Sequence, residues 1–178
     1  MVFADYNQGM KVIFLDFDGV LNSAASFWFE RRFRKAHPEL DDLGPVRETL
    51  CRVCTSNFQV ILDHFPETKV VISSTWRNLF TLDWLKEKLA SYGIDSSRVI
   101  GKTGGADWGD RGTEIQQWLN EHPEVKTYVV LDDNYIGGGI PETNIVKTSW
   151  NVGLTLPHAL EAIQKLGGRK SKHELYME

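Results

Sequence analysis

The stretch VIFLDFDGVLN at residues 12–22 decides the fold expected for this chain. Its first four residues are apolar without alternation, which predicts a short strand covered on both faces. Two carboxylates, Asp16 and Asp18, follow at once and are separated by a single Phe. Two charges about 4 Å apart repel by roughly 4 kcal/mol at an effective dielectric near 20. Such a pair at the end of a buried strand therefore asks for a functional explanation.

Length and composition bound the class of protein. The chain has 178 residues, of which 42% are hydrophobic and 25% charged, and this is enough for one domain with a real core. Its net charge of −4 gives no sign of a general nucleic-acid coat. The start of the chain lacks the pattern of a signal peptide, and no apolar run approaches the roughly 18 residues of a membrane span. With only two cysteines, we expect a cytoplasmic protein without a membrane partner; the oligomeric state stays open.

Short apolar runs alternate with amphipathic segments along the chain. The expected strands are residues 12–15, 70–72, 99–100, 128–131 and 145–146. Apolar spacings of three and four predict helices at residues 46–65, 81–92, 113–120 and 156–166. The first should be one long helix, because Pro45 stands at its start and Pro66 at its end. This order predicts an α/β, Rossmann-like fold with about five parallel strands and helices on both faces.

We expect residues 1–178 to form a single domain, because the sequence shows no repeat, linker or low-complexity run. Residues 169–178 should be frayed. Residues 23–44 do not follow the strand–helix rhythm, and residues 26–40 interleave aromatic and basic side chains. This segment fits a small cap that stacks a base and steers phosphates. It also fits a partly buried helix whose arginines lie along apolar surface, and the pattern leaves both open.

Polar side chains follow the strong strands at the point where each ends. Asp16 follows the first strand, Ser73 and Ser74 the second, and Asp132 and Asp133 the fourth. Because the carboxyl ends of parallel strands meet at one edge of a sheet, we expect these side chains to lie near one another.

The expected cluster suggests a chemistry. Four carboxylates at one edge would repel strongly, and a Mg²⁺ ion bound by a few carboxylates together with substrate phosphate resolves the conflict. Serine hydroxyls, loop amides and Arg111 at a helix start suit an anion. Carboxylates, a metal ion and anion donors together indicate phosphoryl transfer.

These motifs resemble those of the haloacid dehalogenase (HAD) superfamily of phosphohydrolases. DFDGVLN matches its first motif, VVISS its second and VVLDD its fourth. SSTWR, RGTEIQQWL and KTSWNVGLT narrow the resemblance to minimal-cap HAD domains of bacteria and phages, some of which are attached to RNA-repair proteins. The resemblance covers about residues 11–166. It implies a HAD-type phosphatase that depends on Mg²⁺.

The resemblance implies a role for each acidic residue. Asp16 would be the nucleophile that forms an aspartyl-phosphate. Asp18 would act as the general acid toward the leaving oxygen and then as the base toward water. Mg²⁺ would be held by the Asp16 side chain, the Asp18 backbone carbonyl, Asp132 and, directly or through water, Asp133.

The resemblance also implies how the phosphoryl group is bound. Ser73 and Ser74 belong to the second motif and would bind it together with a cation from the third motif. That cation is usually Lys. Here Lys102 lies early in its loop, whereas Arg111 stands at the helix start where the cation normally lies, and we favour Arg111.

Other readings of the same residues remain for comparison. A small cap leaves room for large substrates, so we expect a nucleotide or a nucleic-acid terminal phosphate. The alternatives are a phosphatase of small metabolites such as sugar phosphates, and a non-catalytic phospho-binding or switch domain.

An EF-hand loop at Asp16 and Asp18 would need an entering helix instead of a strand. A response-regulator receiver would place its acceptor Asp after a middle strand. Cys51 and Cys54 are expected as buried small hydrophobes, because no second pair completes a zinc site.

Overall fold

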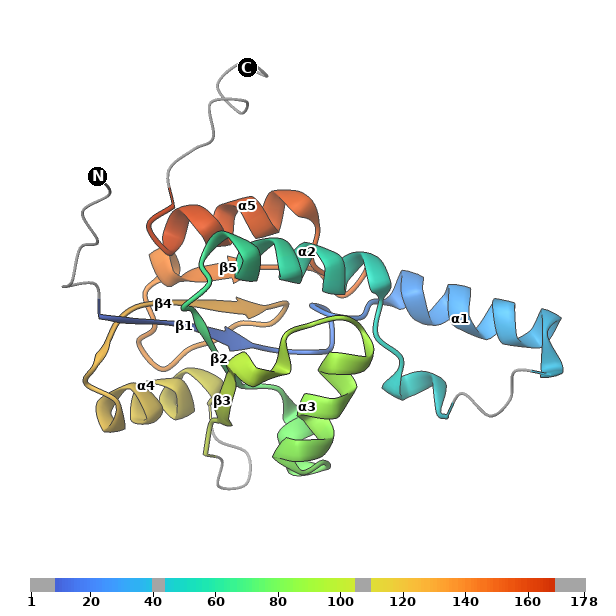
Figure 1. The fold of residues 1–178 in the computed structure, drawn as a ribbon, viewed down its shortest axis with the longest axis horizontal. Helices are drawn as coiled ribbons and strands as arrows, with labels where there is room; N and C mark the ends of the chain where they lie inside the picture. The colour runs from blue at the N-terminus through green and yellow to red at the C-terminus, as the bar shows by residue number, and fades with distance from the viewer. Residues whose placement is uncertain (1–8, 40–43, 105–109, 169–178) are drawn as a thin grey trace, which may run out of the picture.

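A computed structural model of the chain describes residues 9–39, 44–104 and 110–168. Five parallel strands form its sheet and helices cover both faces (Figure 1), so the α/β fold predicted from the sequence is confirmed. The tail expected to be frayed, residues 169–178, lies outside the described residues. Among the helices in the described ranges, none combines the length and the apolar character that crossing a membrane requires.

Each strand coincides with an expected apolar run and extends it by one to four residues. The strands are β1 (Met10–Leu15), β2 (Lys69–Ile72), β3 (Val99–Lys102), β4 (Val125–Asp132) and β5 (Ile145–Lys147). Their order is β3-β2-β1-β4-β5, and all neighbours pair in parallel. After β1 the chain continues to β2, toward one edge of the sheet, and after β4 it continues to β5, toward the other edge. A crevice therefore opens at the carboxyl ends of β1 and β4, where ligands of such sheets bind.

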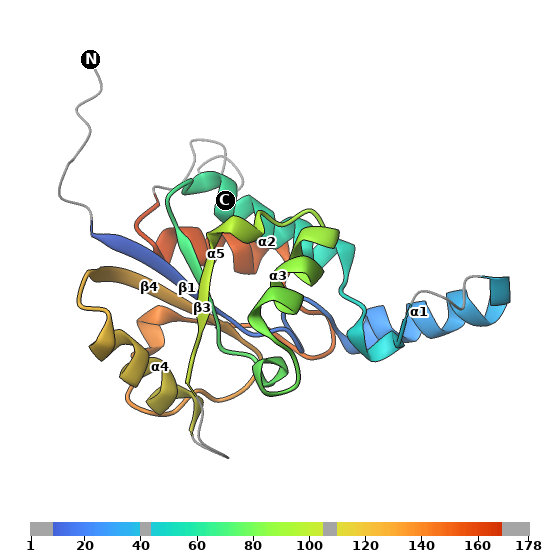
Figure 2. The same ribbon diagram turned by 60° about the horizontal axis from the view of Figure 1, so that its bottom comes forward.

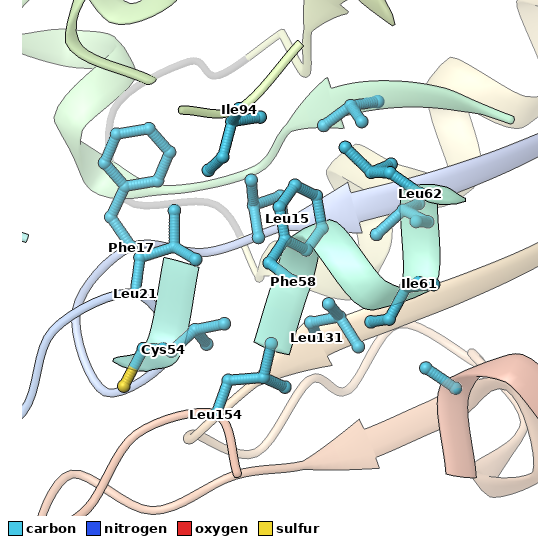
Figure 3. Packing of buried hydrophobic residues seen from close by; sticks show 14 of the residues in the cluster. Leu15, Phe17, Leu21, Cys54, Phe58, Ile61, Leu62, Ile94, Leu131 and Leu154 are labelled. Carbon is cyan, nitrogen blue, oxygen red and sulfur yellow. The ribbon is translucent and has the colours of Figure 1, made fainter. Parts of the chain in front are cut away.

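The side chains on the two faces of β1 belong to two separate hydrophobic clusters. Ile13 and Leu15 pack on one face against helices α2 (Arg52–His64), α3 (Leu82–Ser91) and α5 (Leu156–Lys165). Val12 and Phe14 pack on the other face against α4 (Arg111–Glu121). Figure 3 shows side chains of α2, among them Phe58, directed at the sheet. Burial on both faces explains why the strand sequences are continuously apolar.

The long helix expected at residues 46–65 is wrong. A 3₁₀ turn at Val46–Glu48 is followed by extended backbone, and α2 begins only at Arg52. Tertiary hydrogen bonds favour the break, because the Leu50 N–H donates to the Tyr92 hydroxyl at 3.1 Å and the Cys51 N–H to the Leu21 carbonyl at 2.7 Å. Backbone groups that find such partners do not need the helical ladder.

Residues 23–44, which break the strand–helix rhythm, contain helix α1 (Ala24–Ala36). Ser23 and Ser26 form a reciprocal capping box at its start. The helix projects from the end of the sheet at which the strands finish (Figures 1 and 2). None of its residues is buried, and Trp28 and Phe29 are each 63% exposed. Phe27 and Arg34 are nevertheless half-buried, and the Arg32 guanidinium lies over the Trp28 ring, so the helix fits both the cap and the partly buried alternative.

Candidate active site

Asp16 and Asp132 lie side by side at the carboxyl ends of β1 and β4. The two strands are hydrogen-bonded up to this point, where the Asp16 N–H donates to the Leu131 carbonyl at 3.1 Å. The Arg111 guanidinium, at the start of α4, bridges the two carboxylates: its Nη1 donates to Asp16 Oδ2 at 2.7 Å and also to Asp132 Oδ2. Both carboxylates are buried, with 2% and 0% exposure. Three residues far apart in the sequence are thus joined at one edge.

A third carboxylate, that of Asp133, completes an acidic cluster. Asp16, Asp132 and Asp133 each offer an oxygen, and these oxygens lie within 4.8 Å of one another. Burial raises the pKa of all three carboxyl groups, and the charge of Asp16 further raises the pKa of Asp133 and that of Asp132, which reaches about 6. A nearby cation of charge two would reverse these shifts. Hard carboxylate oxygens are the ligands that Mg²⁺ prefers, so this donor set fits that ion.

The charge of the Arg111 guanidinium depends on the two carboxylates that it bridges. Burial disfavours its charge, but Asp16 and Asp132 outweigh burial, so the pKa of Arg111 is raised. A guanidinium held in this way stays charged and presents its remaining N–H donors at the site. Arg111 therefore offers a fixed positive group beside Asp16, which is suited to a phosphoryl group.

Asp18 is held apart from the acidic cluster by two partners. Its Oδ2 accepts a hydrogen bond from the indole Nε1–H of Trp76 at 2.8 Å, and its Oδ1 accepts one from the Asn22 side-chain amide at 2.8 Å. Trp76 is buried against Phe17, with ring centroids 5.0 Å apart. Trp76 and Asn22 thus fix the Asp18 carboxylate on its own side of the site. The sequence reasoning missed both roles; the available signal was that a buried indole N–H needs an acceptor.

Ser73 and Ser74 follow β2 at the same edge. Burial raises the pKa of Asp16, and Arg111 together with the neighbouring Ser74 side chain opposes that effect. The Ser73 hydroxyl is fully buried and has no hydrogen-bond partner within the described ranges. An unpaired buried hydroxyl costs free energy, so the Ser73 hydroxyl would be stabilised by donating to a bound anion.

Arg77 is a positioning residue for this edge. Its Nη1 donates to the Ser73 carbonyl at 3.0 Å and to the Ser74 carbonyl at 2.8 Å, and its Nη2 pairs with the Glu114 carboxylate on α4. This buried pair ties the serine loop to the helix that carries Arg111. Nothing in the spacing of the sequence singles out Arg77 and Glu114 as a pair.

The two cations considered for the third motif have different surroundings. Arg111 contacts Asp16 directly. Lys102 is exposed, and its Nζ donates to the Arg77 backbone carbonyl at 2.8 Å. The geometry therefore favours Arg111 for binding a phosphoryl group.

Gly19 is required by the close approach of Asp133. Its φ is +72°, and a Cβ at this position would lie 2.3 Å from the Asp133 carboxyl carbon. Gly19→Ala should therefore cost about 1–2 kcal/mol of stability for the left-handed backbone, and should also displace Asp133 and weaken Mg²⁺ binding about 10- to 100-fold. Urea unfolding and metal titration by calorimetry measure the two effects.

Gly93→Ala is the matched control for this prediction. Gly93 has a φ of +85°, and nothing lies within 4 Å of a Cβ placed there. It should show a similar loss of stability and unchanged metal affinity. Equal metal affinity in both variants would contradict a role of Asp133 in binding the metal ion.

Comparisons with known proteins bear on the family and the fold of the chain. A family model described as the HAD domain in Swiss Army Knife RNA repair proteins matches residues 12–159. Among solved structures, the HAD domain of effector protein Lem4 from Legionella pneumophila has a TM-score of 0.55 and covers 89% of this chain and 96% of its own. The two sequences are 17% identical, so that likeness bears on the fold alone. No curated protein sequence matches the chain.

Proposed function

Because the chain belongs to the family of HAD domains found in Swiss Army Knife RNA repair proteins, which supports a phosphatase-like function, we propose that it is a Mg²⁺-dependent phosphomonoesterase. The observation that carries the proposal is the joining of Asp16, Asp132 and Arg111 at the carboxyl ends of β1 and β4. A buried nucleophile beside a fixed guanidinium and an acidic cluster is the set of groups that phosphoryl transfer needs.

The first half of the reaction transfers the phosphoryl group to Asp16. The Asp16 carboxylate attacks phosphorus, a bond to the aspartyl oxygen forms, and the bond to the leaving oxygen breaks. Asp18 gives its proton to that leaving oxygen. Trp76 and Asn22 hold the Asp18 carboxyl group in place for this step. Arg111 and the Ser73 hydroxyl bind the equatorial oxygens, on which charge is spread in the loose transition state.

The second half hydrolyses the aspartyl-phosphate. Asp18, now a carboxylate, takes a proton from water, and the water attacks phosphorus to release inorganic phosphate and restore Asp16. Asp16, Asp132, Asp133 and the Asp18 backbone carbonyl would hold Mg²⁺. The ion would supply charge neutralisation between the carboxylates and the transferring group.

We propose a nucleotide or nucleic-acid terminal phosphate as the substrate, with the segment around α1 as a small cap of a single domain. Within α1, four basic residues stand against one acidic residue, although the chain as a whole carries a net charge of −4. An exposed basic helix beside an active site attracts polyanions. The family description, which names RNA repair, is consistent with this preference.

Removal of divalent metal should abolish phosphate release. After treatment with chelator, we expect at least about a 100-fold loss of turnover, because the three carboxylates then repel the substrate phosphate. Added Mg²⁺ should restore activity, and Ca²⁺, which prefers more ligands at longer distances, should restore it less. A phosphate-release assay on an aryl phosphate provides the measurement, and undiminished turnover in excess chelator would refute the metal dependence.

The same assay ranks the substrates. Oligonucleotides phosphorylated at the 5′ or 3′ end should be hydrolysed with a higher kcat/KM than small sugar phosphates. If sugar phosphates are turned over equally well, the nucleic-acid preference is wrong, while the phosphatase proposal stands.

A further inference from the structure

A cavity of about 600 Å³ opens at Asp18, and its lining includes none of the three residues of the acidic cluster. Four of its nine lining residues are aromatic, and they come from three separate parts of the chain: Phe27, Trp76 with Phe80, and Trp150. The exposed Leu79 side chain lies at its edge, and Arg47 and Glu48 add one charge of each sign. Asp18 is the residue proposed to protonate the leaving oxygen, so this cavity lies where the leaving group of the substrate would be.

The aromatic walls are held in defined positions. Trp76 is buried, its indole N–H is fixed on Asp18 at 2.8 Å, and its ring lies 5.6 Å from that of Phe80. On the opposite side, Phe27 of α1 packs against Trp150, with centroids 5.7 Å apart and planes 49° apart. Trp150 is nevertheless 44% exposed. A large aromatic face left open to water beside a reactive carboxylate costs free energy, unless a ligand covers it.

We propose that this cavity binds the nucleobase of the substrate, stacked on Trp150 and Phe27, and that it thereby selects nucleotides over aliphatic phosphates. The proposal rests on the proposed function and names the substrate class of the same site. Its volume falls in the range of small-molecule sites, which runs from about 300 to 1,000 Å³. Aromatic side chains stack on any base, because every base has a π-face.

The two charged residues favour a nucleobase over the ring of a phosphotyrosine. The Glu48 carboxylate accepts hydrogen bonds and suits the exocyclic amino group of a base, which a phenol ring lacks. The Arg47 side chain is 85% exposed, and its Nε lies 3.9 Å from Glu48 Oε1, which is beyond hydrogen-bond distance, so its guanidinium is available to a neighbouring phosphate. A nucleotide chain offers both partners, whereas a phosphopeptide offers neither in a fixed place.

The larger cavity of the described structure, about 710 Å³ between α1 and the start of α2, has a different position. Its lining includes neither Asp18 nor any residue of the acidic cluster. It is therefore not placed to select the leaving group, and the smaller cavity carries the inference.

Trp150 provides the test, because its backbone carbonyl supports α1 while its side chain faces the cavity. The experiment measures kcat/KM for a 5′- and a 3′-mononucleotide and for glycerol phosphate, with Mg²⁺. In Trp150→Ala, the ratio of nucleotide to glycerol phosphate kcat/KM should fall about 5- to 150-fold, the usual strength of one base–aromatic stack. Trp150→Phe should keep most of the ratio. Trp28→Ala removes an exposed tryptophan of α1 that does not line this cavity and should leave the ratio unchanged.

Two results would overturn the proposal. An equal loss for nucleotide and glycerol phosphate would make Trp150 a support of α1 and not a stacking surface. Preferential hydrolysis of a phosphotyrosine peptide, lost in the same variant, would assign the cavity to a peptide ring.

Equilibrium binding separates this inference from the proposed function. Mononucleotide binding to Asp16→Asn protein, with and without Trp150→Ala, is measured by calorimetry. If no substrate is hydrolysed but this binding depends on Trp150, the phosphatase proposal fails and the base-binding cavity stands. If hydrolysis proceeds with no dependence on Trp150, the reverse holds.

Discussion

Asp16→Asn is expected to lower phosphatase turnover by at least about 1,000-fold, because the substitution removes the nucleophile and leaves its position almost unchanged. Asparagine has the same shape, so the Phe17 N–H can still donate to an oxygen at this position, as it does to Asp16 Oδ1 at 2.8 Å. Arg111 keeps Asp132 as its partner. The fold should therefore persist. Phosphate release and thermal unfolding measure the two halves of the prediction.

The stability of this variant should equal or exceed that of the natural protein. Burial raises the pKa of Asp16, which means that its charge is held at a cost in the folded state. Removing the charge removes the cost. Asp63→Asn, the same change at an exposed position of α2, is the matched control and should keep full activity. Hydrolysis retained in Asp16→Asn would rule out the covalent route.

Arg111→Met should reduce kcat/KM by at least about 100-fold, because the guanidinium is the one cation in direct contact with both Asp16 and Asp132 within the described ranges. Methionine keeps much of the apolar stem and removes the charge. Lys102→Met is the control for the competing assignment. Lys102 donates to a backbone carbonyl away from the carboxylates, so this variant should stay within about threefold of the natural protein.

The same variant carries a second readout that does not need substrate. Without Arg111, the Asp16 and Asp132 carboxylates repel with less compensation, so the metal-free protein should unfold at a lower temperature. Mg²⁺ should then raise the unfolding temperature more in Arg111→Met than in the natural protein, because the ion relieves a larger repulsion. A larger loss of activity in Lys102→Met than in Arg111→Met would reverse the assignment of the third motif.

The sequence predicted the parts of the fold that depend on local pattern. Continuously apolar runs such as residues 12–15 become strands buried on both faces, and polar residues directly after them meet because the strands are parallel. Arg111 could be expected beside Asp16, since it stands at a helix start on the same edge. These inferences need only periodicity and topology.

Other features depend on contacts that no local pattern encodes. The helix expected from residue 46 breaks near Leu50, because Leu21 and Tyr92, distant in the sequence, hydrogen-bond that backbone. The hydrogen bond from Trp76 to Asp18 joins residues that are 58 positions apart. The buried pair of Arg77 with Glu114 joins the 3₁₀ turn that follows β2 to α4, across 37 positions. Each arises from tertiary packing, which overrides intrinsic preference.

Helix α1 should tolerate substitutions better than the sheet does. Since none of its residues is buried, substitutions on its outward surface should each change the free energy of unfolding by less than about 0.5 kcal/mol. Many different surfaces can therefore evolve on α1 without displacing the reactive carboxylates, which lie at the ends of the strands. Homologues would then diversify in what they bind long before they diverge in how they cleave it.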